Sequence, residues 1–301
     1  MEKKGKILNE LYEINIRKEK LEQELKELEA KNVNVKKLIP ILMSNYLYFD
    51  LFKKYFELTF GNNISLANET FNISDKVSIK FLHESIKRSN YEVYTYLIDK
   101  GIDVNSINNE GYSPLMMLAF SGFSEVYYFT KLIGETRSEK DYITRDISDF
   151  SKISYKISNN KKVILDYKKD GCSALHYFAT NDKIVYIAML QALGYNLKET
   201  DPNGNNIMTL YYKKMCESKI KGKLYPFGNI VYIDTSIFEL IWKEKNNEGQ
   251  TPLTIVAKYG RGDIFRELCN ALRNIPEAKS AIEEAEKILI ESYEKELSEK
   301  Y

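Results

Sequence analysis

The stretch KFLHESIKRSNYEVYTYLIDKGIDVN, residues 80–105, decides the fold. Its apolar residues fall into two short helical patterns separated by Ser89 and Asn90, and Gly101 stands where a helix C-terminus favours a left-handed residue. The stretch therefore predicts two helices joined by a turn. Because a pair this short cannot bury its own apolar face, similar units are expected to stack against it.

Related stretches recur along the chain. Their equivalent start positions are separated by 33, 60, 33 and 45 residues, and they are Lys80, Ser113, Ser173, Asn206 and Thr251. Two of the gaps equal a 33-residue period, and the two longer gaps are what insertions would produce. Self-similarity at a fixed period indicates a repeat architecture in which each unit buries its apolar face against its neighbours.

The repeated pattern resembles that of the ankyrin-repeat family, G-x-T-P-L-H-x-A-A-x-x-G followed by a second helix and G-A-D-V-N. The fullest matches are GYSPLMMLAFSG (111–122), GCSALHYFAT (171–180) and GQTPLTIVAKYG (249–260). The resemblance covers about five units over residues 74–272, two of them with insertions, at 135–168 and 213–235. It implies a mainly α fold, an ankyrin-type helix-turn-helix solenoid with β-hairpin fingers.

Each position of the pattern has a physical reason. Ser or Thr before Pro caps a helix whose first residue is already fixed at a helical φ, and the glycine before it accepts the positive φ of a tight turn. His83 and His176 occupy the histidine position of the motif. The resemblance implies that these two imidazoles join one repeat to the next by hydrogen bonds.

The ends of the chain carry different patterns. Residues 1–34 have a heptad seam, formed by Ile7, Leu11, Ile14, Lys18, Leu21, Leu25 and Leu28. This seam predicts a coiled-coil-like helix and a homodimer through residues 7–35, with a helix folded onto its own domain as the alternative. Residues 35–73 predict a helical N-terminal cap in which 59–74 is a loop, and residues 273–301 predict a C-terminal capping helix.

Composition and cysteine usage set the class of protein. The 44 basic and 43 acidic residues give a net charge of +1, so no global field steers the chain to nucleic acid or to an anionic membrane. Cys172, Cys216 and Cys269 are odd in number and widely spaced, which favours reduced surroundings over a disulfide framework or a zinc site. No signal peptide or membrane span is predicted. We expect a cytoplasmic protein, or one in a host cytosol if it is delivered as an effector.

The sequence gives no support to catalysis. Both histidines are assigned to the repeat motif, which leaves no base for a Ser-His-Asp or Cys-His site and no cluster for a His-containing metal site. Phosphate-binding glycine motifs are also missing from the sequence. We therefore expect no enzyme activity, no catalytic residues, no cofactor and no metal.

The expected function is to bind another protein through the concave face and finger tips of the repeats. The finger-tip residues carried over from the resemblance are Asn109, Glu110, Tyr112, Lys169, Asp170, Pro202, Asn203, Asn205, Asn247, Glu248 and Gln250. The helix positions on the same face are Lys87, Met117, Phe120, Tyr177, Thr180, Ile255 and Lys258. Tyr112, Phe120 and Tyr177 are the expected anchors, with packing between repeats as the alternative role of Phe120.

Two alternative functions remain open. The first is an inhibitor or effector that occupies the working surface of a protein from another organism. The second is a nucleic-acid binder that uses a β-hairpin predicted over residues 151–169, where Ile153, Tyr155 and Ile157 alternate with polar residues. Its cationic and aromatic residues are Lys152, Lys156, Lys161, Lys162, Lys168, Lys169, Tyr155 and Tyr167.

Overall fold

The computed structural model describes Gln23 and residues 39–43, 48–61, 63–74, 77–121, 166–181, 187, 190, 195–218 and 238–300. Apart from Gln23, the predicted heptad helix lies outside the described residues, and so do all residues of its seam and residues 151–165 of the predicted hairpin. The described residues are mainly helical, as expected. The chain divides into two compact units, the first made of residues 1–110 and 121–123 and the second of residues 111–120 and 124–301.

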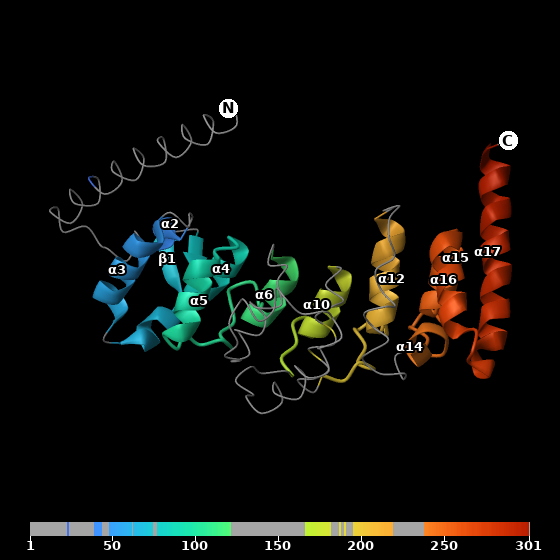
Figure 1. Ribbon diagram of the computed structural model, residues 1–301, viewed down its shortest axis with the longest axis horizontal. Helices are drawn as coiled ribbons and strands as arrows, with labels where there is room; N and C mark the ends of the chain where they lie inside the picture. The colour runs from blue at the N-terminus through green and yellow to red at the C-terminus, as the bar shows by residue number, and fades with distance from the viewer. Residues whose placement is uncertain are drawn as a thin grey trace, which may run out of the picture. The chain divides into compact units, whose positions relative to one another are not determined.

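The first unit contains the two helices predicted from residues 80–105. Its elements are α2 (Ile39–Leu42), α3 (Phe49–Phe60), the 3-10 helix η3 (Ile64–Asn68), β1 (Phe71–Ser74), β2 (Val77–Ile79), α4 (Phe81–Lys87) and α5 (Tyr91–Asp99), coloured blue to green in Figure 1. Ser89 turns the chain between α4 and α5 with a φ of 51°. The Asn90 side chain then caps α5 by accepting a hydrogen bond from the Val93 N–H at 3.1 Å.

One prediction for this unit is wrong, because residues 59–74 are not a plain loop. They include the end of α3, the 3-10 helix η3 and the strand β1, which pairs antiparallel with β2 so that Phe71 lies opposite Ile79. The Phe71 ring lies 4.6 Å from Phe81 and 5.4 Å from Phe60, measured between centroids. Packing of this half-buried ring against Phe60 and Phe81 outweighs the turn preference of the neighbouring Asn and Ser residues.

Helix α3 packs on α5 in the first unit. The Phe56 ring lies 5.8 Å from both Phe81 and Tyr96, and the Tyr96 hydroxyl donates to Glu57 at 2.6 Å. Lys100 also forms an ion pair with Glu57. The hydrogen bond from Lys100 is the largest cause that lowers the pKa of the Glu57 carboxyl, and the hydrogen bond from Tyr96 is the second. The aromatic contacts therefore carry most of the packing, with one ion pair at the edge.

The second unit holds a row of helices. Its elements are α6 (Pro114–Phe120), α10 (Ala174–Thr180), α12 (Ile207–Glu217), α14 (Glu239–Trp242), α15 (Pro252–Lys258), α16 (Gly262–Leu272), the 3-10 helix η6 (Pro276–Ala278) and α17 (Lys279–Lys300). In this row α6 packs on α10, α10 on α12, α12 on α15, and α15 on α17, from green to red in Figure 1.

Each predicted start position directly precedes a helix, namely α4, α6, α10, α12 or α15. In the second unit the side chains of Ser113, Asn206 and Thr251 accept hydrogen bonds from the N–H three residues later, at 3.2, 2.9 and 3.2 Å. Ser173 begins a capping box, in which its backbone N–H donates to Nδ1 of His176 at 3.1 Å. These caps fix the helices in a common register.

The register places matched side chains in the core. Two residues after each start, Leu115, Leu175, Met208 and Leu253 are at most 1 % exposed. Helix α12 differs from the expectation in length, since it continues to Glu217 although an insertion was predicted from Lys213. The reason is that Tyr212 and Cys216 continue the buried side of the helix.

Candidate partner-binding face

Three turns in the second unit lead into α10, α12 and α15, and we call them the tip turns. They span residues 169–172, 201–205 and 246–250. In the second turn one carboxylate oxygen of Asp201 accepts the N–H groups of Asn203 and Asn205 at 2.9 and 2.8 Å. Asn246 plays the same role in the third turn, so both turns are held internally.

The second and third tip turns are also joined to each other. The Asn247 N–H donates to the Asn203 carbonyl at 3.0 Å, and the Asn247 side chain donates to the Pro202 carbonyl at 3.1 Å. Gly204 lies at this junction with a φ of 74°, where a side chain would collide with Asn247. The two turns therefore form one continuous polar edge.

The structure separates the predicted tip residues by their exposure. Asp170, Asn203, Asn247 and Glu248 are exposed. Asn205 is only 6 % exposed, because its amide donates to Asp201 at 3.0 Å and accepts from Asn246 at 2.9 Å. We assign Asn205 to joining the turns instead of to partner contact.

The remaining predicted residues fall in two places. Lys87, Asn109 and Glu110 are exposed and belong to the first unit. Met117 and Thr180 are half-buried in the second unit, where the Thr180 hydroxyl donates to the His176 carbonyl at 3.1 Å.

The three predicted aromatic anchors lie together, and we call them the aromatic cluster. Ring centroids are 5.4 Å apart for Tyr112 and Phe120, 5.6 Å for Tyr112 and Tyr177, and 5.4 Å for Phe120 and Tyr177, all edge to face. Phe120 is 47 % exposed, and the two tyrosines are half-buried. The two tyrosines thus fix the position of the Phe120 ring while about half of it stays exposed to solvent.

Lys169 borders the cluster. Its amine lies 4.8 Å from the centre of the Tyr112 ring and forms an ion pair with Asp170, and that hydrogen bond raises the pKa of Lys169. Burial is the largest cause that raises the pKa of Tyr177 to about 12, and neighbouring titratable groups contribute less. The hydroxyl of Tyr177 therefore stays protonated at neutral pH.

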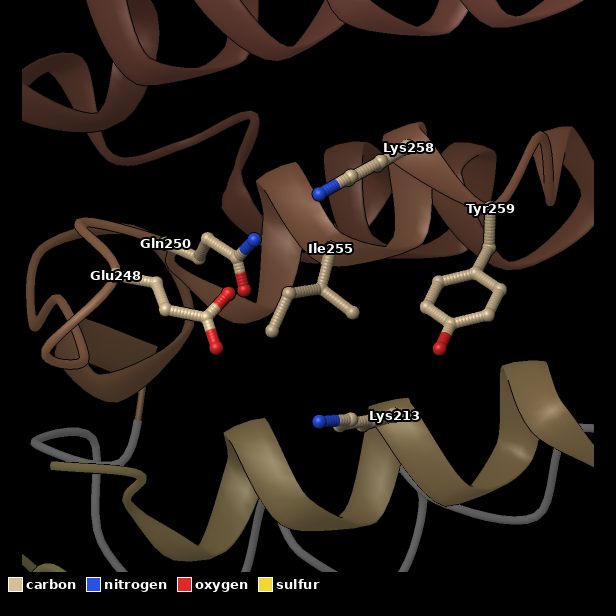
Figure 2. A pocket seen from close by; sticks show the side chains of 6 residues that line it. All are labelled: Lys213, Glu248, Gln250, Ile255, Lys258 and Tyr259. Atoms are coloured by element: carbon tan, nitrogen blue, oxygen red, sulfur yellow. The ribbon is translucent and has the colours of Figure 1, made fainter. Parts of the chain in front are cut away.

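A groove lies further along the row, between α12 and α15. It encloses about 240 Å³ and is lined by Lys213, Glu248, Gln250, Ile255, Lys258 and Tyr259. In Figure 2, Ile255 and Tyr259 point from α15 toward α12, Lys213 lies opposite them, and the third tip turn closes one end. Glu248, Gln250, Ile255 and Lys258 are four of the residues predicted for the binding face.

Sequence reasoning missed Lys213 and Tyr259. Lys213 was placed in an insertion, yet it stands seven residues after Asn206, as Lys258 stands seven after Thr251 and Phe120 seven after Ser113. Extending the repeat register through the fourth unit would have found it. Tyr259 is 45 % exposed, and its hydroxyl lies 3.4 Å from the Glu217 carboxylate.

The two lysines of the groove make no ion pair with the described residues. Within the described part of the chain, neither Lys213 nor Lys258 has an ion pair, and both are exposed. Burial, followed by the negative charge of Glu217, raises the pKa of Tyr259, which therefore stays neutral. Lys213 on α12 and Lys258 on α15, set against the single carboxylate of Glu248, leave the groove lining with a net positive formal charge.

The described histidines and cysteines are buried or half-buried. His83 and His176 are 4 % and 2 % exposed, and burial lowers the pKa of His176, so its imidazole is neutral. All three cysteines are free thiols, and burial raises the pKa of Cys216 and of Cys269 to about 11. No group of three or more metal-binding side chains occurs among the described residues.

One comparison with known proteins finds a relative. The chain is similar to the human transient receptor potential cation channel subfamily A member 1, with 24% identity over 221 residues that cover 70% of this chain and 19% of the channel. This weak similarity to a protein with ankyrin repeats points to ankyrin-like repeats here. No family model matches the chain.

The limits of that similarity follow from its coverage. The chain spans about a fifth of the length of the channel that it matches, 19%. Among the described residues, no helix has both the length and the apolar character needed to cross a bilayer.

Proposed function

We propose that the chain is a non-enzymatic scaffold that binds another protein, built as an ankyrin-type solenoid with the tip turns as its fingers. The aromatic cluster on α6 and α10 carries the proposal, because it is a preformed anchor with Phe120 47 % exposed. The groove between α12 and α15 extends the same series of helix positions. Aromatic side chains that are fixed before binding lose little entropy and dominate interface energies.

Two related functions are compatible with this face. A scaffold that holds a partner and an inhibitor or effector that blocks one use the same contacts, and identifying the partner distinguishes them. Nucleic-acid binding has less support, because the two described lysines of the predicted hairpin are engaged: Lys168 pairs with Glu199 and Lys169 with Asp170. Tyr167 is engaged as well, since its hydroxyl donates to the Gly111 carbonyl at 2.8 Å.

Capture of proteins from the source cells tests the proposal. The tagged chain, a Tyr112→Ala/Phe120→Ala variant and a Leu297→Ala control are used as baits, and co-eluting proteins are quantified by mass spectrometry. Leu297 is a matched control because it is an apolar residue of α17 with 58 % exposure, outside the face. We expect the double variant to lose the specific partners and the control to keep them.

Thermal unfolding of the same variants separates binding from stability. We expect small shifts in Tm, because the two side chains are partly solvent-exposed in the native chain. Equal capture by all three baits would remove the aromatic cluster as the partner site.

A further inference from the structure

We propose that the face selects a partner segment with two features: an apolar residue that rests on the aromatic cluster, and an acidic residue that enters the groove between Lys213 and Lys258. This inference rests on the proposed function and names the chemistry of the partner. It follows from how the character of the face changes along the row of helices.

The change is visible at one repeated position. Seven residues after each start in the second unit, the side chains are Phe120 in α6, Thr180 in α10, Lys213 in α12 and Lys258 in α15. Equivalent positions of helices packed side by side present their side chains to the same surface. At this position the face is therefore aromatic at α6, polar at α10 and cationic at α12 and α15. The aromatic residue of α10, Tyr177, stands four residues after its start.

The groove suits a carboxylate with an apolar stem. Ile255 is 3 % exposed and forms an apolar floor, with Lys213 and Lys258 on either side of it (Figure 2). An Asp or Glu side chain can lay its methylene groups on Ile255 and its carboxylate between the two ammonium groups. Neither lysine has to leave another ion pair within the described part of the chain, so the contact does not sacrifice an existing one.

Glu248 narrows the choice of anion. Its carboxylate lies at the end of the groove, beside the amide of Gln250. Two lysines and one glutamate leave the lining residues with a formal charge of +1, which balances one carboxylate. A phosphate group carries more negative charge and would meet Glu248 at close range, so the groove favours a carboxylate.

The spacing of the two sites sets the length of the segment. From the aromatic cluster, between α6 and α10, to the groove, between α12 and α15, there are two steps along the row of helices. Packed helices lie about 8–10 Å apart, which makes the two sites roughly 16–20 Å apart. An extended peptide covers about 3.3 Å per residue, so the apolar and acidic residues are expected about five or six positions apart.

Peptide selection tests this prediction directly. Phage displaying random dodecapeptides are panned on the immobilised full chain, and the recovered sequences are compared with the unselected library. We expect enrichment of Asp or Glu at about five or six positions from a large apolar residue. Selected sequences without acidic residues, or a failure to enrich any peptide, would overturn the inference.

Charge reversal places the acidic residue in the groove. An enriched peptide is labelled, and its binding is measured by fluorescence anisotropy on the native chain and on a Lys213→Glu/Lys258→Glu variant. We expect binding to weaken by at least about tenfold, because like charges would then face one another. A Lys214→Glu/Lys245→Glu variant makes the same change of charge at exposed lysines that do not line the groove, and it should bind like the native chain.

The remaining outcomes are distinct. Equal loss in both lysine variants would reduce the effect to overall charge and overturn the inference. Retention of a single-stranded oligonucleotide that is lost in the Lys213→Glu/Lys258→Glu variant, without binding of acidic peptides, would assign the groove to nucleic acid instead. If partner capture from cells needs Phe120 but not the two lysines, the inference fails and the proposed function stands.

Discussion

Gly204 and Gly249 share a backbone conformation but not an environment. Their φ values are 74° and 75°. A Cβ atom at Gly204 would lie 2.5 Å from Oδ1 of Asn247 and 2.9 Å from its backbone nitrogen, whereas at Gly249 it would meet nothing within 4 Å. We expect Gly249→Ala to cost about 1–2 kcal/mol, the strain of a left-handed alanine. Gly204→Ala should cost at least about 1 kcal/mol more, because it also pushes the joined tip turns apart.

Urea unfolding of both variants measures this difference. Since the two substitutions change the same atoms at nearly the same φ, the excess cost reports only on the contact between the turns. Equal losses would show that the turns at 201–205 and 246–250 are not packed together in solution.

His176 links stability to pH. Burial lowers its pKa from the ordinary value of 6.5, so the unfolded chain binds a proton at this residue more readily than the folded chain does. The contribution of His176 to the free energy of unfolding is therefore complete above pH 6.5 and decreases as the pH falls below it. A His176→Gln variant should be less stable at neutral pH and should lose less stability on acidification. An unchanged pH dependence in the variant would contradict this assignment.

At the scale of elements, Asn206 sets the start of α12. Its carbonyl oxygen Oδ1 accepts the Thr209 N–H at 2.9 Å, and its Nδ2 donates to the Leu240 carbonyl at 3.2 Å. We expect Asn206→Ala to cost about 1–3 kcal/mol, because a cap is lost and a buried carbonyl loses its donor. Asn206→Asp keeps the cap acceptor and removes the donor, so the unfolding free energies of the two variants separate the contributions.

The helices could be predicted because their signals are local. A capping residue, a turn glycine and an apolar residue two positions after the cap recur at Ser113, Ser173 and Thr251, and a helix follows each of them. The pairing of β1 with β2 had no such signal, since it depends on contacts of Phe71 with Phe60 and Phe81. The aromatic cluster could be anticipated from the register, but its three edge-to-face contacts could not, because side-chain packing between helices is not encoded in spacing alone.

The groove shows the same distinction between local and distant information. Four of its six lining residues follow from the repeat register, and Lys213 was missed because the irregular sequence after Tyr212 suggested that the helix had ended. What positions Lys213 opposite Ile255 is the packing of α12 on α15. A surface built by two helices becomes visible only once their contact is known.

At the scale of the whole molecule, the heptad seam of residues 1–34 bears on how strongly the face can bind. We expect the full chain to sediment as a dimer and a chain beginning at Val33 to sediment as a monomer, because the seam offers about four heptads to a second copy. A dimer presents two copies of the face, so its capture of a partner immobilised at high density should exceed that of the truncated chain by about tenfold or more, with equal affinity for the free partner. Leu21→Ser/Leu25→Ser in the full chain is the control that removes the seam without shortening the chain. A monomer mass for both chains would show that the heptad helix folds onto its own domain, and any difference in capture would then have to come from contacts of that helix with the partner.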